Sequence, residues 1–297
     1  MTPAPTRETP AGRAYNDVRN LARRDGRDSA EYFTLYALEG FLARLAASEH
    51  SRDFVLKGGV LMAAFAARRP TRDIDLAASG FRNDVGGVAQ RVRAIAMVDA
   101  GDGLLFEAES VSGVAIRDEA DYAGVRVTLT AQLAAARIAL HVDVNFGDPI
   151  WPEAIHTTLP LLLGGTLQVR GYPDHMVLAE KIVTAVDRGG ANTRWRDFVD
   201  IAAIIESRSL RQADLASAID VVADHRKVTM SPLAGVLNGM AEIAQPKWAA
   251  WRRKQRLEGT TPARFQDLLD RCVAFTDPVL DGRVTGFTWS PASRAWQ

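Results

Sequence analysis

The chain has 297 residues, of which 47% are hydrophobic, and it carries 36 basic and 36 acidic side chains. No stretch approaches the roughly 20 uninterrupted apolar residues that a membrane-spanning helix needs, and the N-terminus lacks the apolar centre of a signal peptide. With a single cysteine, Cys272, this predicts a cytoplasmic protein with no membrane association. The balanced charge excludes a uniformly basic surface, so any polyanion must bind to a local patch.

The N-terminal half has the pattern of a mixed α/β fold. Residues 1–13 are rich in Pro and Thr, and we predict a flexible segment over residues 1–27. Leucines at steps of three and four predict a helix that begins near Asp28 or Ser29. The next predicted elements are a strand ending at Lys57, a helix over 60–67, a strand over 71–76, and strands around 125–129 and 138–144. Residues 80–120 show no clear pattern.

From Pro173 onward the pattern is helical. Predicted helices cover residues 174–187, a segment starting near 196, and roughly 210–224, 235–257 and 262–275. Cys272 falls on an apolar face of the last helix and is predicted to be buried. We therefore predict an α+β protein, with an α/β domain over residues 28–170, a mainly helical domain over residues 171–297, and the functional site in the cleft between them.

Two carboxylates lie close together on the strand predicted over 71–76. Asp73 and Asp75 flank Ile74, so they point to the same face, about 7 Å apart. Two like charges so placed repel unless a cation lies between them, and oxygen ligands of this kind suit Mg²⁺. In an arbitrary protein such a pair more often marks a solvated strand edge or turn. The preceding strand, Gly-Gly pair and helix favour the metal site here.

Gly58 and Gly59 stand at the start of the helix between the two strands. Glycine lets backbone N–H groups come close to a ligand at a helix N-terminus, where phosphate is favoured. An ordinary tight turn is the alternative. Lys57 is placed either to face phosphate or as an exposed lysine at the end of its strand.

A third carboxylate, Asp143, lies on the strand around 138–144. The aliphatic residues of this strand face one way, while His141, Asp143 and Asn145 face the other. If the strand lies beside that of Asp73, Asp143 would join the metal site or act as general base. The alternative is a polar outer face. His141 lacks Cys or His partners at zinc spacing, so we interpret it as a structural neighbour.

The order of these residues resembles the signature of the DNA polymerase β-like nucleotidyltransferase superfamily, which is Gly-Gly or Gly-Ser, a helix, Asp-x-Asp, and a later carboxylate. The helical half is similar to the AbiEii family of nucleotidyltransferase toxins, and within it to mycobacterial toxins that modify tRNA. Lys181 fits the lysine motif of that family, and Asp197 and Asp200 fit its Asp-x-x-Asp motif. The resemblance covers roughly residues 40–207.

Physical roles follow for these helical residues. Lys181 lies beside an apolar helix face, where its ammonium would bind a triphosphate and offset developing negative charge. Asp197 and Asp200 are one helical turn apart and would orient Lys181 or contact the sugar and base, unless they form a set of ion pairs on the helix surface. Basic and aromatic side chains that suit a triphosphate or an RNA backbone gather around the same loop: Arg188, Arg194, Trp195 and Arg196.

Two further features suggest regulation and RNA binding. Thr71 lies two residues before Asp73, so a phosphate added there would repel the phosphates of a nucleotide, and we hypothesise that this modification silences the site. Residues 247–256 mix basic residues with Trp248 and Trp251 and would hold an RNA end. A solvated helix with two core tryptophans is the alternative for this segment.

The resemblance implies a nucleotidyltransferase core followed by a helical domain. It implies Mg²⁺-dependent transfer of nucleotide from an NTP to the 3′ acceptor end of tRNA, which would block aminoacylation and translation, and a cognate antitoxin. The resulting catalytic candidates are Asp73, Asp75, Asp143 and Lys181, with the three aspartates as metal ligands. The nucleotide-binding candidates are Lys57, Gly58, Gly59, Thr71, Lys181, Arg194, Asp197 and Asp200. Two alternatives stay open: transfer to a protein or small-molecule hydroxyl, and a non-catalytic scaffold that binds nucleotide or RNA.

Overall fold

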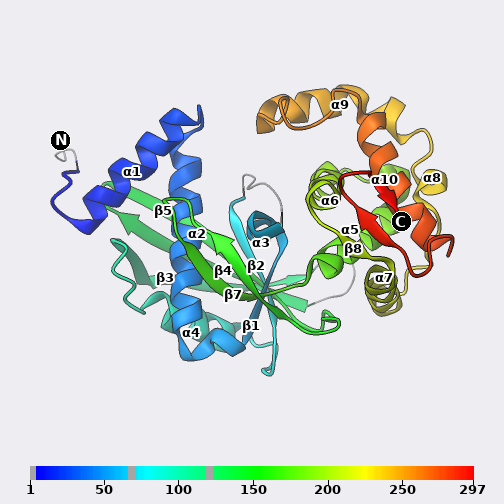
Figure 1. Ribbon diagram of the computed structural model, residues 1–297. Helices are drawn as coiled ribbons and strands as arrows, with labels where there is room; N and C mark the ends of the chain where they lie inside the picture. Colours follow the sequence, from blue (N-terminus) through cyan, green and yellow to red (C-terminus); the bar gives the residue numbers. More distant parts are fainter. Residues whose placement is uncertain (1–4, 66–70, 118–122) are drawn as a thin grey trace. The chain divides into compact units, whose positions relative to one another are not determined.

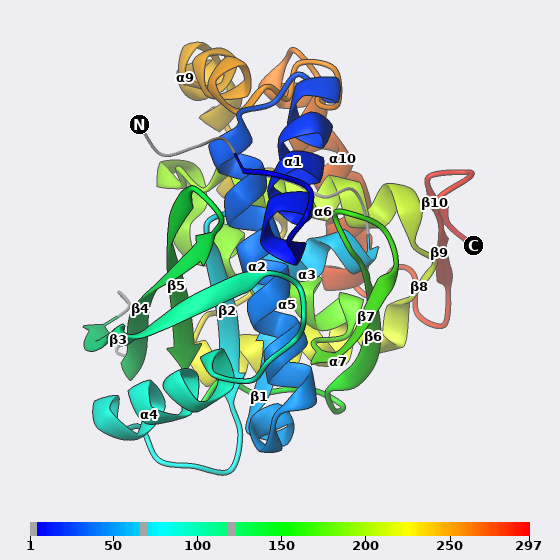
Figure 2. The ribbon, with the colours of Figure 1, turned by 90° about the vertical axis from the view of Figure 1, so that its left-hand side faces the viewer.

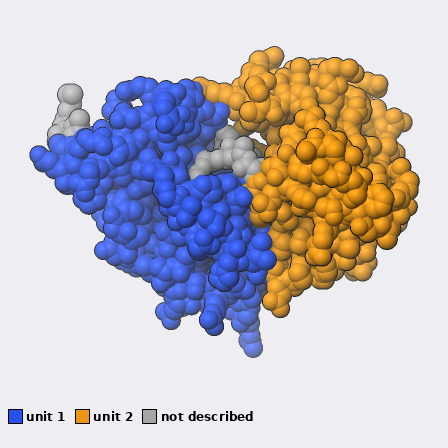
Figure 3. Space-filling view, in the orientation of Figure 1, with its two compact units in different colours: residues 1–64, 68–148, 154–172 blue, residues 65–67, 149–153, 173–297 orange. Residues whose placement is uncertain are grey.

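The computed structural model describes residues 5–65, 71–117 and 123–297. The chain divides into two compact units (Figure 3), the first made of residues 1–64, 68–148 and 154–172, and the second of residues 65–67, 149–153 and 173–297. The fold is α+β, as predicted, with a large mixed sheet in the first unit and mostly helices in the second (Figure 1). Within the described residues, no helix is both long enough and apolar enough to cross a membrane.

The first unit is built on a seven-stranded sheet in the order β3-β4-β5-β2-β1-β7-β6. Its strands are β1 (Phe54–Lys57), β2 (Asp73–Ala78), β3 (Leu104–Arg117), β4 (Ala123–Leu133), β5 (Ala136–Asn145), β6 (Ile155–Pro160) and β7 (Thr166–Gly171). Its helices are α1 (Pro10–Arg24), α2 (Ser29–Ala47), α3 (Gly58–Phe65) and α4 (Val85–Ala96), with a 3-10 turn over Glu49–Arg52. Strand β2 pairs in parallel with β5 and antiparallel with β1.

Helices α2 and α4 contact each other and the sheet (Figures 1 and 2), so one face of the sheet is covered. The strand residues that point into this layer are fully buried, among them Ile74 and Leu76 on β2 and Val142 and Val144 on β5. Because side chains alternate along a strand, the residues between them point to the opposite face. That opposite face carries Asp73, Asp75 and Asp143.

Several elements differ from the predicted ones. Residues 80–120, which showed no clear pattern, contain α4 and the whole of β3. Helix α3 begins at Gly58 itself, and the end predicted for it beyond Phe65 lies outside the described residues. Strand β2 begins at Asp73, so Thr71 precedes the strand instead of sharing its face.

The expected flexible segment over residues 1–27 contains the helix α1, which packs on α2. The Thr9 hydroxyl accepts a hydrogen bond from the backbone N–H of Gly12 at 3.0 Å and thereby caps this helix. Val18 and Ala22 are completely buried on its inner face. Burial of this narrow stripe of small side chains orders the segment despite its Pro- and Thr-rich start.

The second unit is mainly helical. Its helices are α5 (Asp174–Arg188), α6 (Trp195–Ser207), α7 (Gln212–Arg226), α8 (Leu233–Val236), α9 (Met240–Gln255) and α10 (Phe265–Leu280), with a 3-10 turn over Gly189–Ala191. The short strands β8 (Leu210–Arg211), β9 (Thr288–Ser290) and β10 (Ala295–Trp296) form a separate three-stranded sheet. Helix α5 packs against α6 and α7, and α10 packs against α6. Cys272 is buried within α10, as predicted, and burial raises the pKa of its thiol to about 12.

Candidate active site

Four charged residues form one row across four neighbouring strands of the first unit. The register pairs Lys57 on β1 with Asp75 on β2, Asp75 with Asp143 on β5, and Asp143 with Arg126 on β4. Residues paired in register on adjacent strands point to the same face of the sheet. The charges along the row are therefore positive, negative, negative and positive. Asp73 lies two residues before Asp75 on β2, so it points to the same face of the sheet.

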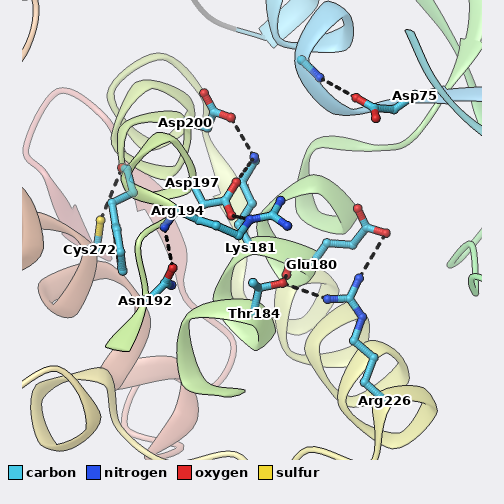
Figure 4. A network of polar contacts seen from close by, with 12 residues as sticks. Asp75, Glu180, Lys181, Thr184, Asn192, Arg194, Asp197, Asp200, Arg226 and Cys272 are labelled. Atoms are coloured by element: carbon cyan, nitrogen blue, oxygen red, sulfur yellow. Dashed lines mark hydrogen bonds and ion pairs between the residues drawn. The ribbon is translucent and has the colours of Figure 1, made fainter. Parts of the chain in front are cut away.

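Gly58 and Gly59 bring the start of α3 against Asp75. Gly58 has a φ of +66°, and a Cβ added to it would lie 1.9 Å from Asp75 Oδ2. The Gly59 N–H donates a hydrogen bond to the same oxygen at 3.4 Å, drawn as the dashed line at Asp75 in Figure 4. Only glycine combines this backbone conformation with such a close approach. The Gly-Gly pair is thus specific to the carboxylate site and is more than a tight turn.

The environment of Asp75 disfavours its negative charge. Burial raises the pKa of its carboxyl to about 6, the nearby charge of Lys57 opposes this, and the charge of Asp143 adds to it. A carboxylate held where negative charge accumulates is one that a cation would stabilise strongly.

The carboxylate of Asp143 is bound on both oxygens by Arg126. Arg126 Nε donates to Oδ1 at 2.7 Å and Nη2 donates to Oδ2 at 2.6 Å, a bidentate pair. This contact raises the pKa of the Arg126 guanidinium above its ordinary value. Among residues 5–65, 71–117 and 123–297, no three His, Cys, Asp or Glu side chains are arranged to hold a metal ion. The predicted three-carboxylate group is therefore not present as a ready ligand set.

The donors that remain still fit magnesium. Asp73 and Asp75 offer carboxylate oxygens from one face of one strand, and Mg²⁺ is usually bound by one or two carboxylates together with water and substrate phosphates. The missing Cβ of Gly58 leaves the Asp75 carboxylate directly beside the start of α3, where the phosphates of a nucleotide are also favoured.

Lys57 is not an exposed lysine at the end of a strand. Its side chain is buried, its Nζ lies 2.5 Å from Asp148 Oδ2, and the ammonium lies 5.6 Å from the centre of the Tyr172 ring. Its charge acts on Asp75 across the strand pair and lowers the pKa of that carboxyl. We interpret Lys57 as a buried countercharge of the carboxylate row. Asp148 had not been singled out from the sequence.

Thr71 lies immediately before β2 and is half-buried. Its hydroxyl donates a hydrogen bond to the backbone carbonyl of Asp73 at 3.3 Å. A group added to this hydroxyl would therefore stand beside the backbone of the first carboxylate, although Thr71 is not part of the strand face.

A second cluster lies within the helical unit. Lys181 on α5 donates hydrogen bonds to Asp197 at 3.0 Å and to Asp200 at 2.7 Å (Figure 4). Arg194 Nε donates to the other oxygen of Asp197 at 2.7 Å. Burial opposes ionisation of Asp197, but the charges of Lys181 and Arg194 hold the pKa of its carboxyl below the usual value. Because Lys181 and both aspartates are buried, this cluster is not a set of ion pairs on the helix surface.

The basic and aromatic segment over residues 247–256 belongs largely to the core. Trp248 is fully buried and stacks on Trp251 and Phe265, and Trp195 meets the same two rings edge-on. Arg252 is buried and donates to the backbone carbonyls of a neighbouring turn. The structure thus favours the alternative of a helix with core tryptophans, and only its exposed basic residues remain available to RNA.

The structure gathers the sequence candidates into two groups. Those of the first unit are Lys57, Gly58, Gly59, Asp73, Asp75 and Asp143, with Thr71 adjacent; those of the second are Lys181, Arg194, Asp197 and Asp200. Arg126 was missed, although its position between Val125 and Val127 on an alternating strand indicates that it points away from the buried layer.

An α+β fold with a Gly-Gly helix start, an Asp-x-Asp strand and a carboxylate on its parallel neighbour is the arrangement expected of a nucleotidyltransferase. The family model described as the nucleotidyl transferase AbiEii toxin of a type IV toxin–antitoxin system matches residues 40–271. The chain therefore belongs to the AbiEii nucleotidyltransferase toxin family, and it is an enzyme of that class.

Two solved structures from Helicobacter pylori resemble the chain. One is JHP933, at 15% identity and a TM-score of 0.39, covering 74% of this chain and 93% of that protein. The other is a candidate nucleotidyltransferase, at 15% identity and a TM-score of 0.38, covering 74% and 97%. No curated protein shows significant sequence similarity to the chain.

Proposed function

We propose that the protein transfers a nucleoside monophosphate from an NTP to the 3′-terminal hydroxyl of tRNA. The acceptor oxygen forms a bond to the α-phosphorus, the bond from this phosphorus to the β-phosphate oxygen breaks, and pyrophosphate leaves. An altered acceptor end cannot be aminoacylated, so translation stops. The type IV toxin–antitoxin family implies that an antitoxin partner counteracts this activity.

The contact of the Gly58–Gly59 helix start with Asp75 is the observation that carries the proposal. It brings a helix N-terminus, where phosphate is favoured, against a buried carboxylate that a cation would stabilise, and the two together suit a metal-bound triphosphate. Asp73 and Asp75 would hold the cation. When bound, Mg²⁺ polarises the α-phosphate and neutralises charge on the leaving pyrophosphate.

Asp143 is the proposed general base. It lies in register with Asp75 on the parallel neighbouring strand, so its carboxylate faces the same side as the two metal ligands. A carboxylate there accepts the proton of the attacking hydroxyl as the oxygen–phosphorus bond forms.

In the helical unit, Lys181 supplies positive charge to the phosphates, and Asp197 and Asp200 hold its ammonium in a fixed position. Arg194 binds Asp197 with one nitrogen and adds a second cation to this cluster. In this proposal, residues 28–170 form the nucleotidyltransferase domain, with α1 packed on it, and residues 171–297 form the helical domain.

The test is incubation of the purified protein with total bacterial RNA, Mg²⁺ and each α-labelled NTP in turn. We expect label at tRNA length with wild-type protein, no label with Asp75→Asn, and full label with Asp220→Asn, which alters an exposed carboxylate on α7. Label on protein or on a small molecule would instead identify another acceptor hydroxyl.

The competing function is a scaffold that binds nucleotide or RNA without catalysis. It requires that toxicity survive in the Asp75→Asn variant and that no NTP give a labelled product. Growth of cells expressing this variant, measured beside the labelling assay, separates the two functions.

A further inference from the structure

Arg126 binds the carboxylate of Asp143, which the proposed reaction needs as its general base. Both oxygens of Asp143 accept hydrogen bonds from its guanidinium, at 2.7 and 2.6 Å. The pair is asymmetric in exposure, since the Asp143 side chain is only 12% exposed and that of Arg126 is 42% exposed. The carboxylate is thus largely enclosed, while the arginine beside it on the adjacent strand keeps nearly half of its side chain open to solvent.

The guanidinium and a divalent cation compete for the same negative charge. Arg126 lies close enough to feel the charges of Asp73 and Asp75 as well as that of Asp143. A cation held by Asp73 and Asp75 would repel Arg126, and the guanidinium bound to both oxygens of Asp143 lowers the affinity of that carboxylate for a cation or a proton. The ion pair and a bound cation therefore oppose each other.

A nucleotide resolves this competition. Arginine binds phosphate in the same bidentate way as carboxylate, and a triphosphate offers several such oxygens. A guanidinium that moves from Asp143 to phosphate frees the base and holds the substrate in one displacement.

We propose that Arg126 is a positioning residue that clamps Asp143 in the nucleotide-free protein and releases it when the triphosphate takes over the guanidinium. This inference rests on the proposed function and adds a regulatory step to it. The clamp keeps the carboxylate site weak for cations until a nucleotide is present, so binding of the two is cooperative.

The test measures Mn²⁺ affinity of the nucleotide-free protein by electron paramagnetic resonance. We expect Arg126→Gln to tighten Mn²⁺ binding on the order of tenfold, the equivalent of one charge-assisted hydrogen bond. Arg126→Lys, which keeps the charge but loses the bidentate geometry, should lie between that variant and the wild type. Arg137→Gln is the matched control, because Arg137 forms a comparable two-nitrogen pair with Glu107 on the same sheet, and it should leave Mn²⁺ affinity unchanged.

Combining Arg126→Gln with Asp143→Asn distinguishes a clamp on Asp143 from a general effect of the arginine's charge. In that background, Arg126→Gln should tighten Mn²⁺ binding clearly less than it does with Asp143 present, because only the repulsion between Arg126 and a cation at Asp73 and Asp75 is then removed. Equal Mn²⁺ affinity of wild type and Arg126→Gln would overturn the clamp, and so would an equal gain with and without Asp143.

The same data separate the clamp from the proposed function. If wild-type protein binds Mn²⁺ and labels RNA, and Asp75→Asn does neither, the proposed function stands whatever Arg126 does. If no variant binds Mn²⁺ and none labels RNA, both the clamp and the proposed function fail.

Discussion

Replacing Asp75 by asparagine should stabilise the metal-free protein at alkaline pH, although it removes a residue proposed to be essential. Burial raises the pKa of this carboxyl from an ordinary 3.8 to about 6, so the folded state binds this proton more tightly than the unfolded chain does. The resulting stabilisation is fully present below the unfolded pKa and is lost as the pH rises through about 6. Above that pH, the ionised and buried Asp75 lowers the free energy of unfolding by its full amount.

The magnitude follows from the difference between the two pKa values. About 2 pKa units correspond to about 3 kcal/mol, which is an upper limit because water reaches part of the half-buried side chain. An asparagine at this position is neutral, and its carbonyl oxygen still accepts the hydrogen bond of the Gly59 N–H. For a protein of this size, each kcal/mol moves the melting temperature by roughly 2–4 °C.

The assay is thermal unfolding in buffer with a chelator, at about pH 5 and about pH 8, with Asp220→Asn as the exposed control. We expect Asp75→Asn to melt several degrees above wild type at the higher pH and to show about half of that difference at the lower pH, because pH 5 lies about midway between 3.8 and about 6. A variant that is no more stable than wild type at pH 8, or equally stabilised at both, would refute the reasoning.

Three further variants test other parts of the molecule. Lys181→Met should destabilise the protein by about 3 kcal/mol in chemical unfolding, because it removes the ammonium that binds both Asp197 and Asp200, which are buried; adding Asn at both aspartates should recover stability but not nucleotide transfer. Thr71→Glu should lower RNA labelling at least about tenfold, while Thr71→Val leaves most of it, and equal activity of the two would remove Thr71 from regulation. Arg252→Ala should cost about 2 kcal/mol of unfolding free energy through its lost hydrogen bonds, whereas charge reversal of the exposed Arg253 and Lys254 should keep the fold and weaken RNA binding only if this face contacts RNA.

Features that depend on a single helix or strand could be predicted from the sequence. Strand β5 alternates apolar and polar residues because one face packs on helices, so both the strand and the direction of Asp143 follow from period two. The same rule puts Asp73 and Asp75 on one face of β2. The start of helix α2 was marked by Asp28, whose carboxylate caps it in the structure.

Pairs of residues that contact each other across strands could not be predicted from the sequence. Arg126 and Asp143 are 17 residues apart, and nothing local fixes the register that makes them neighbours. Lys57 and Asp148 are 91 residues apart, so the burial of that lysine depends on the completed sheet. Helix α1 was missed for a different reason, since its buried face is made of small residues whose apolar signal is weak beside the Pro and Thr around it.

The backbone at Gly58 has a consequence for the gene. Every missense codon one nucleotide away from a glycine codon encodes a residue with a Cβ, and at this position that atom would collide with the carboxylate of Asp75. The collision includes the Cβ of Asp75, at 2.8 Å, which no rotation of that side chain relieves, so the start of α3 must move away from the carboxylate that it contacts. If Asp75 acts as proposed, codon 58 is a place where any amino-acid replacement would let cells that have lost the antitoxin survive, with a full-length toxin still encoded.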